Sequence, residues 1–208
     1  MVQKRKRQKS QVREWTEAIV FALVIALFIR TFIVQAFKIP SSSMVPTLEV
    51  GDHILVWKFI YGVKIPFIDK KLMVRSPDRG DIVVFLYPKD RSKDFIKRVI
   101  ALPGERIQIV GKEILINDRP IKDPWGYYVR NDGDAESVGD NYGPRIVPPN
   151  SLFVMGDNRD NSQDSRFWGF VDVDSVKGEA FIIYFSWDKR SRNYLKKIRW
   201  TRLGHLIR

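Results

Sequence analysis

The 208-residue sequence contains no cysteine and only two histidines, and these absences narrow its chemistry. Without thiols it has no disulfide framework, no cysteine nucleophile and no Cys-ligated zinc or iron–sulfur centre. His53 lies in a strand-like run and His205 in a basic tail, so we interpret both as structural or surface residues rather than members of a Ser-His-Asp triad. No HExxH motif, Cys/His cluster or EF-hand spacing is present, so no metal and no other cofactor is predicted.

Acidic residues are absent from both ends of the chain, and its excess positive charge lies in these two ends. The net charge is +12, yet residues 1–13 hold six basic side chains and residues 189–208 hold eight. Of the 36 basic residues, 22 then remain against 24 acidic ones, a net charge of −2. A nucleic-acid-binding domain carries its charge on a folded face, so nucleic acid is not a predicted partner. Basic tails fit anionic phospholipids, and residues 189–208 are predicted to lie on a membrane surface.

Long hydrophobic runs are rare, and the one that stands out covers residues 18–29 (AIVFALVIALFI). Apolar character resumes after Arg30 and continues to Phe37, so residues 15–37 are predicted as a transmembrane anchor of about 20 residues. The basic residues 1–14 would stay in the cytoplasm by the positive-inside rule, which places residues 38–208 on the exported side of the cytoplasmic membrane. A cleaved signal peptide has a similar pattern, but no small-x-small cleavage site follows the run.

Short runs rich in β-branched and aromatic residues fill the rest of the chain, bounded by Gly, Pro and Asp. They cover residues 52–60, 81–87, 95–102, 106–110, 113–117, 151–155 and 179–187. Gly111 and Lys112 between two of them indicate a hairpin. No strand–helix alternation is present, so the fold class predicted is a mostly β, antiparallel-sheet domain after one N-terminal transmembrane helix. Residues 120–149 are predicted to form an extended loop or small β excursion.

Three serines follow the predicted anchor in the segment IPSSSMVPTL, residues 39–48. Serine-rich linkers are common beside membrane helices, and such linkers are polar. Here the serines are surrounded by Ile39, Met44 and Leu48, so this segment is a candidate for a packed, functional loop.

A lysine in the run Phe95–Ile100 is a candidate base. If the run is a strand, alternation puts Lys97 on one face with Val99 and Ala101. Burial among apolar neighbours would lower the pKa of the amine from about 10.4 by several units. A neutral amine can take the proton of a serine hydroxyl, as in Ser-Lys variants of nucleophilic catalysis. On spacing alone, an ordinary surface lysine is the simpler interpretation.

Four segments together make the sequence recognisable. PSSSMVPTL (40–48), RGDIVVF (79–85), FIKRVIALPGE (95–105) and GDNRDNSQDSRFWG (156–169) resemble, in this order, the conserved blocks of bacterial type I signal peptidases. The resemblance includes the N-terminal anchor and covers nearly the whole chain, and its last block is long and uncommon. It implies a membrane-anchored serine endopeptidase that removes signal peptides from exported preproteins.

The resemblance also implies a role for each residue at a matching position. Ser43 matches the nucleophile and Lys97 the general base. Ser41 matches a hydroxyl of the oxyanion hole, acting with the Ser43 backbone N–H. Ser162 matches a residue that hydrogen-bonds the lysine amine. Asp164 and Arg166 match a pair that supports the site.

Members of this family cut after small residues at positions −1 and −3. The apolar residues around the predicted dyad are candidates for the walls of the pockets that accept them, and their alternative role is core or membrane contact: Phe37, Ile39, Met44, Leu48 and Ile96. Two other functions stay open at this point. One is a Ser-Lys peptidase of different specificity, and the other is a non-catalytic, membrane-tethered β-domain that binds proteins or peptides.

Overall fold

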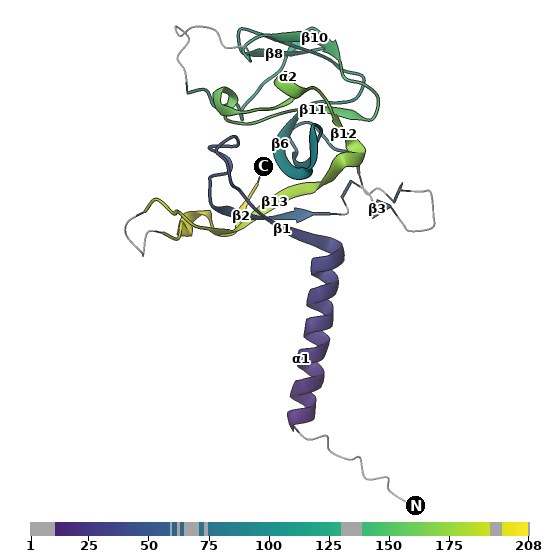
Figure 1. Ribbon diagram of the computed structural model, residues 1–208, viewed down its shortest axis with the longest axis vertical. Helices are drawn as coiled ribbons and strands as arrows, with labels where there is room; N and C mark the ends of the chain where they lie inside the picture. Colours follow the sequence, from purple (N-terminus) through teal and green to yellow (C-terminus); the bar gives the residue numbers. More distant parts are fainter. Residues whose placement is uncertain are drawn as a thin grey trace, which may run out of the picture.

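The computed structural model describes residues 11–58, 60–61, 63–64, 71–72, 75–129, 139–191 and 197–207. A long helix, α1, projects from a body of β-sheets (Figure 1). Helix α1 spans Gln11–Phe28, and a π-helical segment, η1, continues it over Ile29–Ile33. The basic residues 4–9 and the tail residues Arg192, Lys196 and Arg208, on which part of the charge argument rests, lie outside the described residues.

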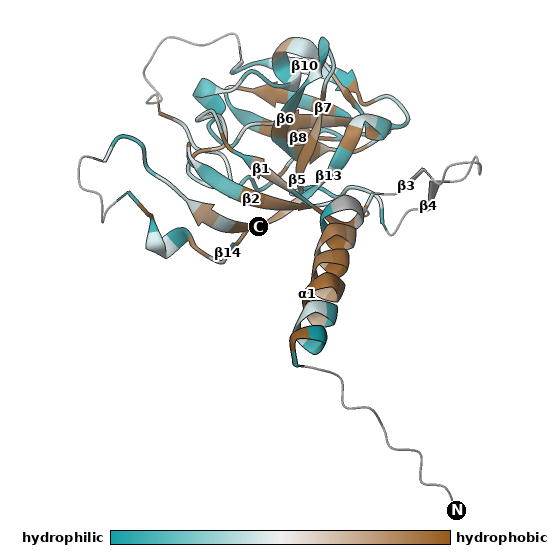
Figure 2. Cartoon of the chain, turned by 60° about the horizontal axis from the view of Figure 1, so that its bottom comes forward, coloured by the Kyte–Doolittle hydropathy of each residue, from teal (hydrophilic) through white to brown (hydrophobic). Residues whose placement is uncertain are grey.

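Hydrophobic residues make up most of α1, as the brown ribbon in Figure 2 shows. None of its residues is buried, and Trp15 and Phe21 are 71% and 68% exposed. Among the described residues, no helix meets the combined length and apolarity that crossing a membrane requires. The transmembrane anchor therefore stays a prediction.

The C-terminal boundary predicted for the anchor is wrong. Residues 34–37 do not continue the helix but form strand β1, Val34–Lys38, which pairs antiparallel with β2, Asp52–Trp57. Phe37 lies opposite Ile54 and packs against the core. Apolar composition alone does not separate helix from strand, and here the pairing with β2 decides.

The larger sheet has eight strands within the described residues, all paired antiparallel, in the order β1-β2-β13-β5-β6-β11-β12, with β14 beside β13. The bounds are β5 Ile82–Tyr87, β6 Asp90–Ala101, β11 Ser151–Met155, β12 Val171–Asp172, β13 Val176–Ser186 and β14 His205–Leu206. The mostly β, antiparallel class is confirmed. Each run predicted over residues 52–60, 81–87, 95–102, 151–155 and 179–187 contains part of one of these strands.

A smaller sheet has the order β10-β7-β8-β9, built from β7 Arg106–Val110, β8 Glu113–Ile116, β9 Arg119–Pro120 and β10 Tyr142–Ile146. Val110 lies opposite Glu113, so the predicted hairpin at Gly111 and Lys112 is confirmed, and both turn residues have positive φ. The predicted excursion at 120–149 supplies β10 and the end of β9, while residues 106–119 supply the rest. Its residues 130–138 lie outside the described residues, and β3 (Val63–Lys64) pairs separately with β4 (Lys71–Leu72).

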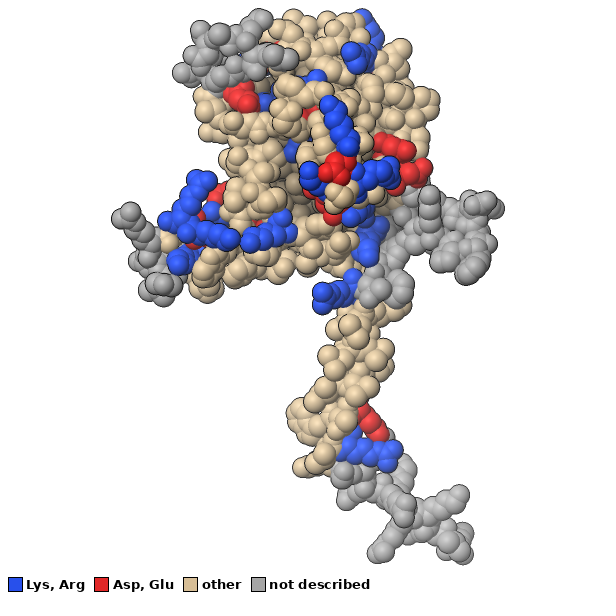
Figure 3. All heavy atoms as spheres, in the orientation of Figure 1, with Lys and Arg blue, Asp and Glu red and all other residues tan. Residues whose placement is uncertain are grey.

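The end of the basic tail belongs to the body. Residues Trp200–Arg202 form a short 3-10 helix, η5, and β14 then pairs with β13, with Leu206 opposite Ile182. Figure 3 shows Lys and Arg side chains near both ends of α1 and along the lower edge of the body. Lys189 and Arg190 are exposed, so a lipid contact of these two residues stays a prediction.

Candidate active site

The loop between β1 and β2 carries Ser43, and its apolar side chains fasten it to the sheet. Met44 and Leu48 are both fully buried, in one core cluster with side chains of β2, β5 and β13. The Leu48 N–H donates to the Met44 carbonyl over 2.8 Å, which closes one helix-like turn. Burial of each of these side chains stabilises the loop by about 1.5–3 kcal/mol. Ser43, directly before Met44, is held in place and is 8% exposed.

Strand β6 brings Lys97 to the same place. Lys97 lies opposite Val83 of β5 and is 4% exposed. Its Nζ donates to Ser43 Oγ over 2.7 Å and to the Ile96 carbonyl over 3.0 Å. The ring of Phe95 lies 5.7 Å from the same nitrogen. A serine and a lysine 54 positions apart therefore form a direct, buried hydrogen bond.

Burial changes the proton affinity of this amine. Loss of water around the ammonium lowers the pKa of Lys97 from its ordinary value of 10.5 to about 8. The charges of Asp164 and Asp157 act in the opposite direction, and the charge of Arg166 adds to the lowering. Near pH 8, a large share of the molecules thus carries a neutral amine, which can accept a proton from the hydroxyl that it contacts.

Ser41 completes a group of two hydroxyls and one amine. Its Oγ lies 3.5 Å from Ser43 Oγ, and the residue is exposed, so a group bound at Ser43 can reach its hydroxyl. Among the described residues, no three or more His, Asp or Glu side chains gather closely enough to hold a metal ion. The arrangement suits attack by an activated hydroxyl on a carbonyl, with a second hydroxyl at hand as a hydrogen-bond donor.

Sequence reasoning missed Asn158, which holds the Ser43 loop from the polar side. Its backbone N–H donates to the Ser43 carbonyl over 3.1 Å, and its Nδ2 donates to the Ser42 carbonyl over 3.1 Å. The residue is 4% exposed. Its place in the block of residues 156–169 was the available signal, but no pattern in the sequence indicates which carbonyls its amide will bind.

A buried ion pair next to the dyad was also missed. Arg98 donates from Nε and Nη2 to the two carboxylate oxygens of Asp157, over 2.8 and 2.7 Å, and both side chains are fully buried. Thr47 Oγ1 donates to the same carboxylate over 2.5 Å. The pair thus joins β6, the Ser43 loop and the segment that carries Asn158. Removal of one partner would leave a buried charge uncompensated, which is strongly destabilising.

Ser162 differs from its predicted arrangement. Its Oγ is buried without a hydrogen-bond partner, whereas the Lys97 amine binds Ser43 and the Ile96 carbonyl. The predicted hydrogen bond from Ser162 to the lysine is therefore not formed in this structure, because the serine hydroxyl lies against Gly156. Ser162 still borders the site, since the Ser43 carbonyl lies against Gly156 as well.

Asp164 and Arg166 form the ion pair that the family pattern predicts. Arg166 Nε donates to Asp164 Oδ1 over 2.8 Å, and the Asp164 side chain is fully buried. Asp164 Oδ2 accepts from the Gly156 N–H over 3.0 Å, and Arg166 Nη2 donates to the Arg159 carbonyl over 2.6 Å. Through these bonds the pair fixes the backbone that faces Ser43. Its supporting role in catalysis stays a prediction.

The five apolar residues predicted to line the substrate pockets divide into two groups. Met44 and Leu48 are fully buried and Ile39 is 2% exposed, so a substrate cannot reach them in this structure and they belong to the core. Their side chains face inward and fasten the loop to the core of the larger sheet. Phe37 and Ile96 are only partly buried and pack over the same cluster, so these two remain candidates for direct contact.

A family model and curated relatives are similar to this chain over most of its length. The family model described as signal peptidase, peptidase S26, matches residues 12–187. Signal peptidase I of Pseudomonas fluorescens is 38% identical, over 83% of this chain and 72% of its own, and that of Leptolyngbya laminosa is 39% identical, over 85% and 81%. A solved structure of a signal peptidase I from Enterococcus faecalis V583 matches 50% of this chain and 97% of its own at 29% identity, with a TM-score of 0.42.

Proposed function

The chain belongs to the peptidase S26 family of signal peptidases, serine endopeptidases that remove signal peptides from preproteins, and we propose that Ser43 and Lys97 carry out its reaction. Ser43 acts as the nucleophile and Lys97 as the general base. The observation that carries this assignment is the 2.7 Å hydrogen bond from Lys97 Nζ to Ser43 Oγ. A serine hydroxyl is a weak nucleophile unless a base in contact removes its proton, and the buried amine is such a base.

The reaction follows from the positions of these groups. Ser43 Oγ attacks the scissile carbonyl as its proton passes to the neutral Lys97 amine, and a tetrahedral oxyanion forms. The Ser41 hydroxyl and the Ser43 backbone N–H donate to this oxyanion, and loss of one such donor costs about 3–4 kcal/mol. The C–N bond breaks as the Lys97 ammonium protonates the leaving amine. Water, deprotonated by Lys97, then hydrolyses the acyl ester on Ser43.

The acidic limb of the pH profile should report Lys97. Because only the neutral amine accepts a proton, kcat/KM is expected to rise about tenfold per pH unit and to level off above an apparent pKa of about 8. Initial rates on a peptide without ionisable side chains, measured from about pH 6 to 10, check this. A limb centred near pH 10 would mean that Lys97 is solvated, and a flat profile would mean that it is not the base.

Specificity for small residues at −1 and −3 fits the surroundings of the dyad. Phe37 on β1 and Ile96 on β6 lie partly exposed over the core. Met44 and Leu48 fill the space beneath them. We therefore propose that Phe37 and Ile96 border shallow apolar pockets, which would accept small side chains and exclude large ones.

The phospholipid membrane is the proposed partner of α1. Residues 18–28 of α1 carry only apolar side chains, which are stable in hydrocarbon, whereas in water the helix exposes side chains such as Phe21. Trp15 and Arg30 lie on either side of the uncharged run and suit the two interfaces. The basic residues before the helix would stay in the cytoplasm, with the body on the exported side of the cytoplasmic membrane, where preproteins emerge. Nucleic acid is not a proposed partner.

One experiment tests the activity and the location together. Membranes from cells that produce the chain are washed at alkaline pH, then incubated with a presecretory protein that has Ala at −1 and −3, and the products are mapped by mass spectrometry. We expect a single cut after the −1 residue, with the activity in the washed membranes. A matched substrate with a large aromatic residue at −1 should stay intact.

Other results of this experiment would support other functions. Cuts elsewhere, or a cut that ignores the −1 substitution, would indicate a Ser-Lys peptidase of different specificity. Binding without cleavage would favour the membrane-tethered binding domain. Activity in the alkaline wash, rather than in the membranes, would contradict the anchor without affecting the assignment of the dyad.

A further inference from the structure

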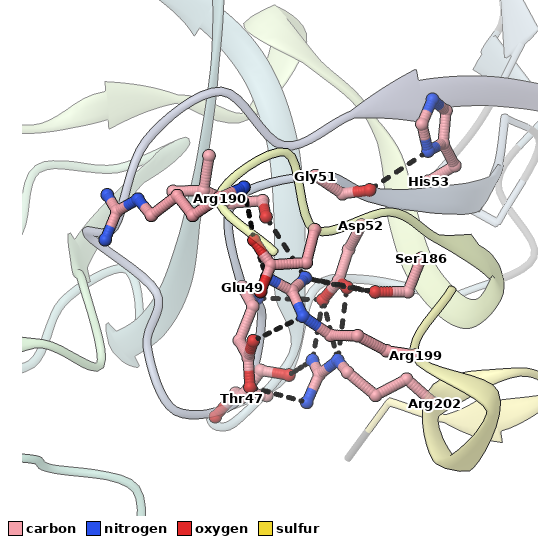
Figure 4. Close-up of polar contacts among 11 residues, drawn as sticks. Thr47, Glu49, Gly51, Asp52, His53, Ser186, Arg190, Arg199 and Arg202 are labelled. Atoms are coloured by element: carbon pink, nitrogen blue, oxygen red, sulfur yellow. Dashed lines mark hydrogen bonds and ion pairs between the residues drawn. The ribbon is translucent and has the colours of Figure 1, made fainter. Parts of the chain in front are cut away.

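A buried carboxylate lies behind the loop that carries Ser43. Asp52, the first residue of β2, is fully buried, with a solvent exposure of 0%. Its Oδ2 accepts from the Glu49 N–H over 2.8 Å, and its Oδ1 accepts from the Ser186 hydroxyl over 2.6 Å (Figure 4). Asp52 thus holds the end of the loop against β13. A carboxylate in such a place is costly unless a cation neutralises it.

The cation comes from the end of the chain. Arg202 donates to both carboxylate oxygens of Asp52, with Nη2 2.6 Å from Oδ2 and Nε 3.1 Å from Oδ1. Its neighbour Arg199 donates to the Val50 carbonyl over 3.1 Å and to Ser186 Oγ over 3.2 Å. The segment is fixed to the sheet by β14, by the bond from the Gly204 N–H to the Ile183 carbonyl and by the bond from the Ile207 N–H to the Phe181 carbonyl. This fixation makes Arg202 a firm support for the loop.

Arg202 also reaches the Ser43 loop itself. Its Nη2 donates to the Thr47 carbonyl over 2.9 Å. Thr47 is held from the opposite side by its hydroxyl, which donates to Asp157. Asp157 in turn pairs with Arg98, the residue after Lys97 on β6. Thr47 is therefore the point at which the C-terminal segment and the network beside the dyad meet.

We propose that Arg202, paired with Asp52, is a positioning residue that holds the loop of Ser43 at the depth where Ser43 Oγ meets Lys97 Nζ. The proposal rests on the assignment of Ser43 and Lys97 made above. Two features of the guanidinium matter: its charge, which neutralises Asp52, and its planar fork, which binds the carboxylate and the Thr47 carbonyl at once. A lysine could supply the charge, but its single nitrogen could not reproduce the bonds that Nε and Nη2 make together to the two carboxylate oxygens and the Thr47 carbonyl.

The test compares four variants in detergent: Arg202→Gln, Arg202→Lys, the double variant Asp52→Asn with Arg202→Gln, and the control Arg106→Gln. Arg106 forms an ion pair with Asp118 on the smaller sheet, away from this network. Each variant is assayed for kcat, for KM, for the rate of acylation by a serine-directed reagent, and for Tm.

Both Arg202 single variants should lose about 10- to 100-fold in kcat and in acylation rate, with KM within about 3-fold of the parent, because a misplacement of about 1 Å can cost 10²-fold. Arg202→Gln should also lower Tm, since it removes the close ion pair of Asp52 and leaves, among the described residues, only Arg199, whose Nη1 lies 3.8 Å from Asp52 Oδ1. The double variant removes the buried charge, so its Tm should recover while its kcat stays low. Arg106→Gln should match the parent in every measurement.

A purely structural role gives different results. In that case Arg202→Lys would be as active as the parent, or kcat would recover with Tm in the double variant, and either result overturns the proposal. Values of kcat within about 3-fold of the parent in all three Arg202 variants would overturn it as well. An incorrect dyad assignment would be recognised separately, because the serine-directed reagent would then acylate a residue of the parent other than Ser43.

Discussion

Ser43→Ala and Lys97→Met are each expected to lower kcat/KM by roughly 10³-fold or more, because the nucleophile and its base act as one unit. The double variant should be little worse than either single one, for the same reason. Ser43→Ala removes the attacking oxygen. Lys97→Met keeps the length of the buried side chain but removes the nitrogen that lies 2.7 Å from Ser43 Oγ. Cleavage of the Ala-x-Ala substrate, followed by mass spectrometry, measures both losses.

The Lys97→Met variant should also be more stable than the parent at neutral pH. The amine has a pKa of about 8 in the folded chain and an ordinary value of 10.5, so the folded state disfavours its charge. Below about pH 8 the full cost of burying that charge applies, about 3 kcal/mol from the difference between the two pKa values. The cost falls as pH rises from 8 towards 10.5 and vanishes above it. Urea unfolding of both proteins at about pH 7 and pH 10 tests this difference.

A matched control lies on the same strand. Lys93 of β6 is 65% exposed and pairs with Asp90 at the surface, so Lys93→Met should leave cleavage unchanged and show no comparable gain in stability. Retention of activity in Lys97→Met would overturn the general-base assignment. Loss of activity together with a large loss of stability would instead mean that the amine serves mainly to hold the fold.

Local pattern was sufficient to predict the elements that carry the dyad. The run of residues 95–102 has strand composition and lies in β6 except for its last residue, but the burial of Lys97 did not follow from spacing, which favoured an ordinary surface lysine. The turn at Gly111 and Lys112 was predictable because few residues adopt positive φ. The end of the anchor was not predictable, since Val34 and Phe37 suit either a helix or a strand until β2 is placed beside them.

The long-range charge pairs could not be predicted from the sequence. Arg98 and Asp157 are 59 positions apart, and Arg202 and Asp52 are 150 apart. The sequence does not show which arginine pairs with which aspartate. Composition alone therefore indicated a membrane-bound tail, whereas Arg202 of this tail neutralises the buried carboxylate of Asp52. The orientation of Ser162 was equally beyond reach, because it depends on how closely Gly156 packs against the Ser43 loop.

Because Gly156 packs so closely against the Ser43 loop, the second large expected effect is the loss of kcat in the variant Gly156→Ala. A methyl group at Gly156 would overlap the Ser43 carbonyl and lie 2.6 Å from Ser162 Cβ. The glycine cannot retreat, because its N–H donates to Asp164 over 3.0 Å and its carbonyl accepts from Arg159 over 3.1 Å. The Ser43 loop must therefore shift, and kcat is expected to fall by about 10²-fold or more. Steady-state cleavage at saturating substrate, with Tm measured alongside, checks this.

Two companion variants separate crowding from other causes. Gly104→Ala places a methyl group in open space at positive φ, so it should cost about 1 kcal/mol of stability through backbone strain and leave kcat unchanged. Adding Ser162→Gly to Gly156→Ala removes the overlap with the serine side chain but not the overlap with the Ser43 carbonyl, so kcat should recover only in part. Full recovery would mean that the Ser162 side chain, not the nucleophile loop, transmits the effect. A kcat for Gly156→Ala within about 5-fold of the parent would mean that the loop tolerates the shift, and that the 2.7 Å contact of Ser43 with Lys97 does not depend on this backbone.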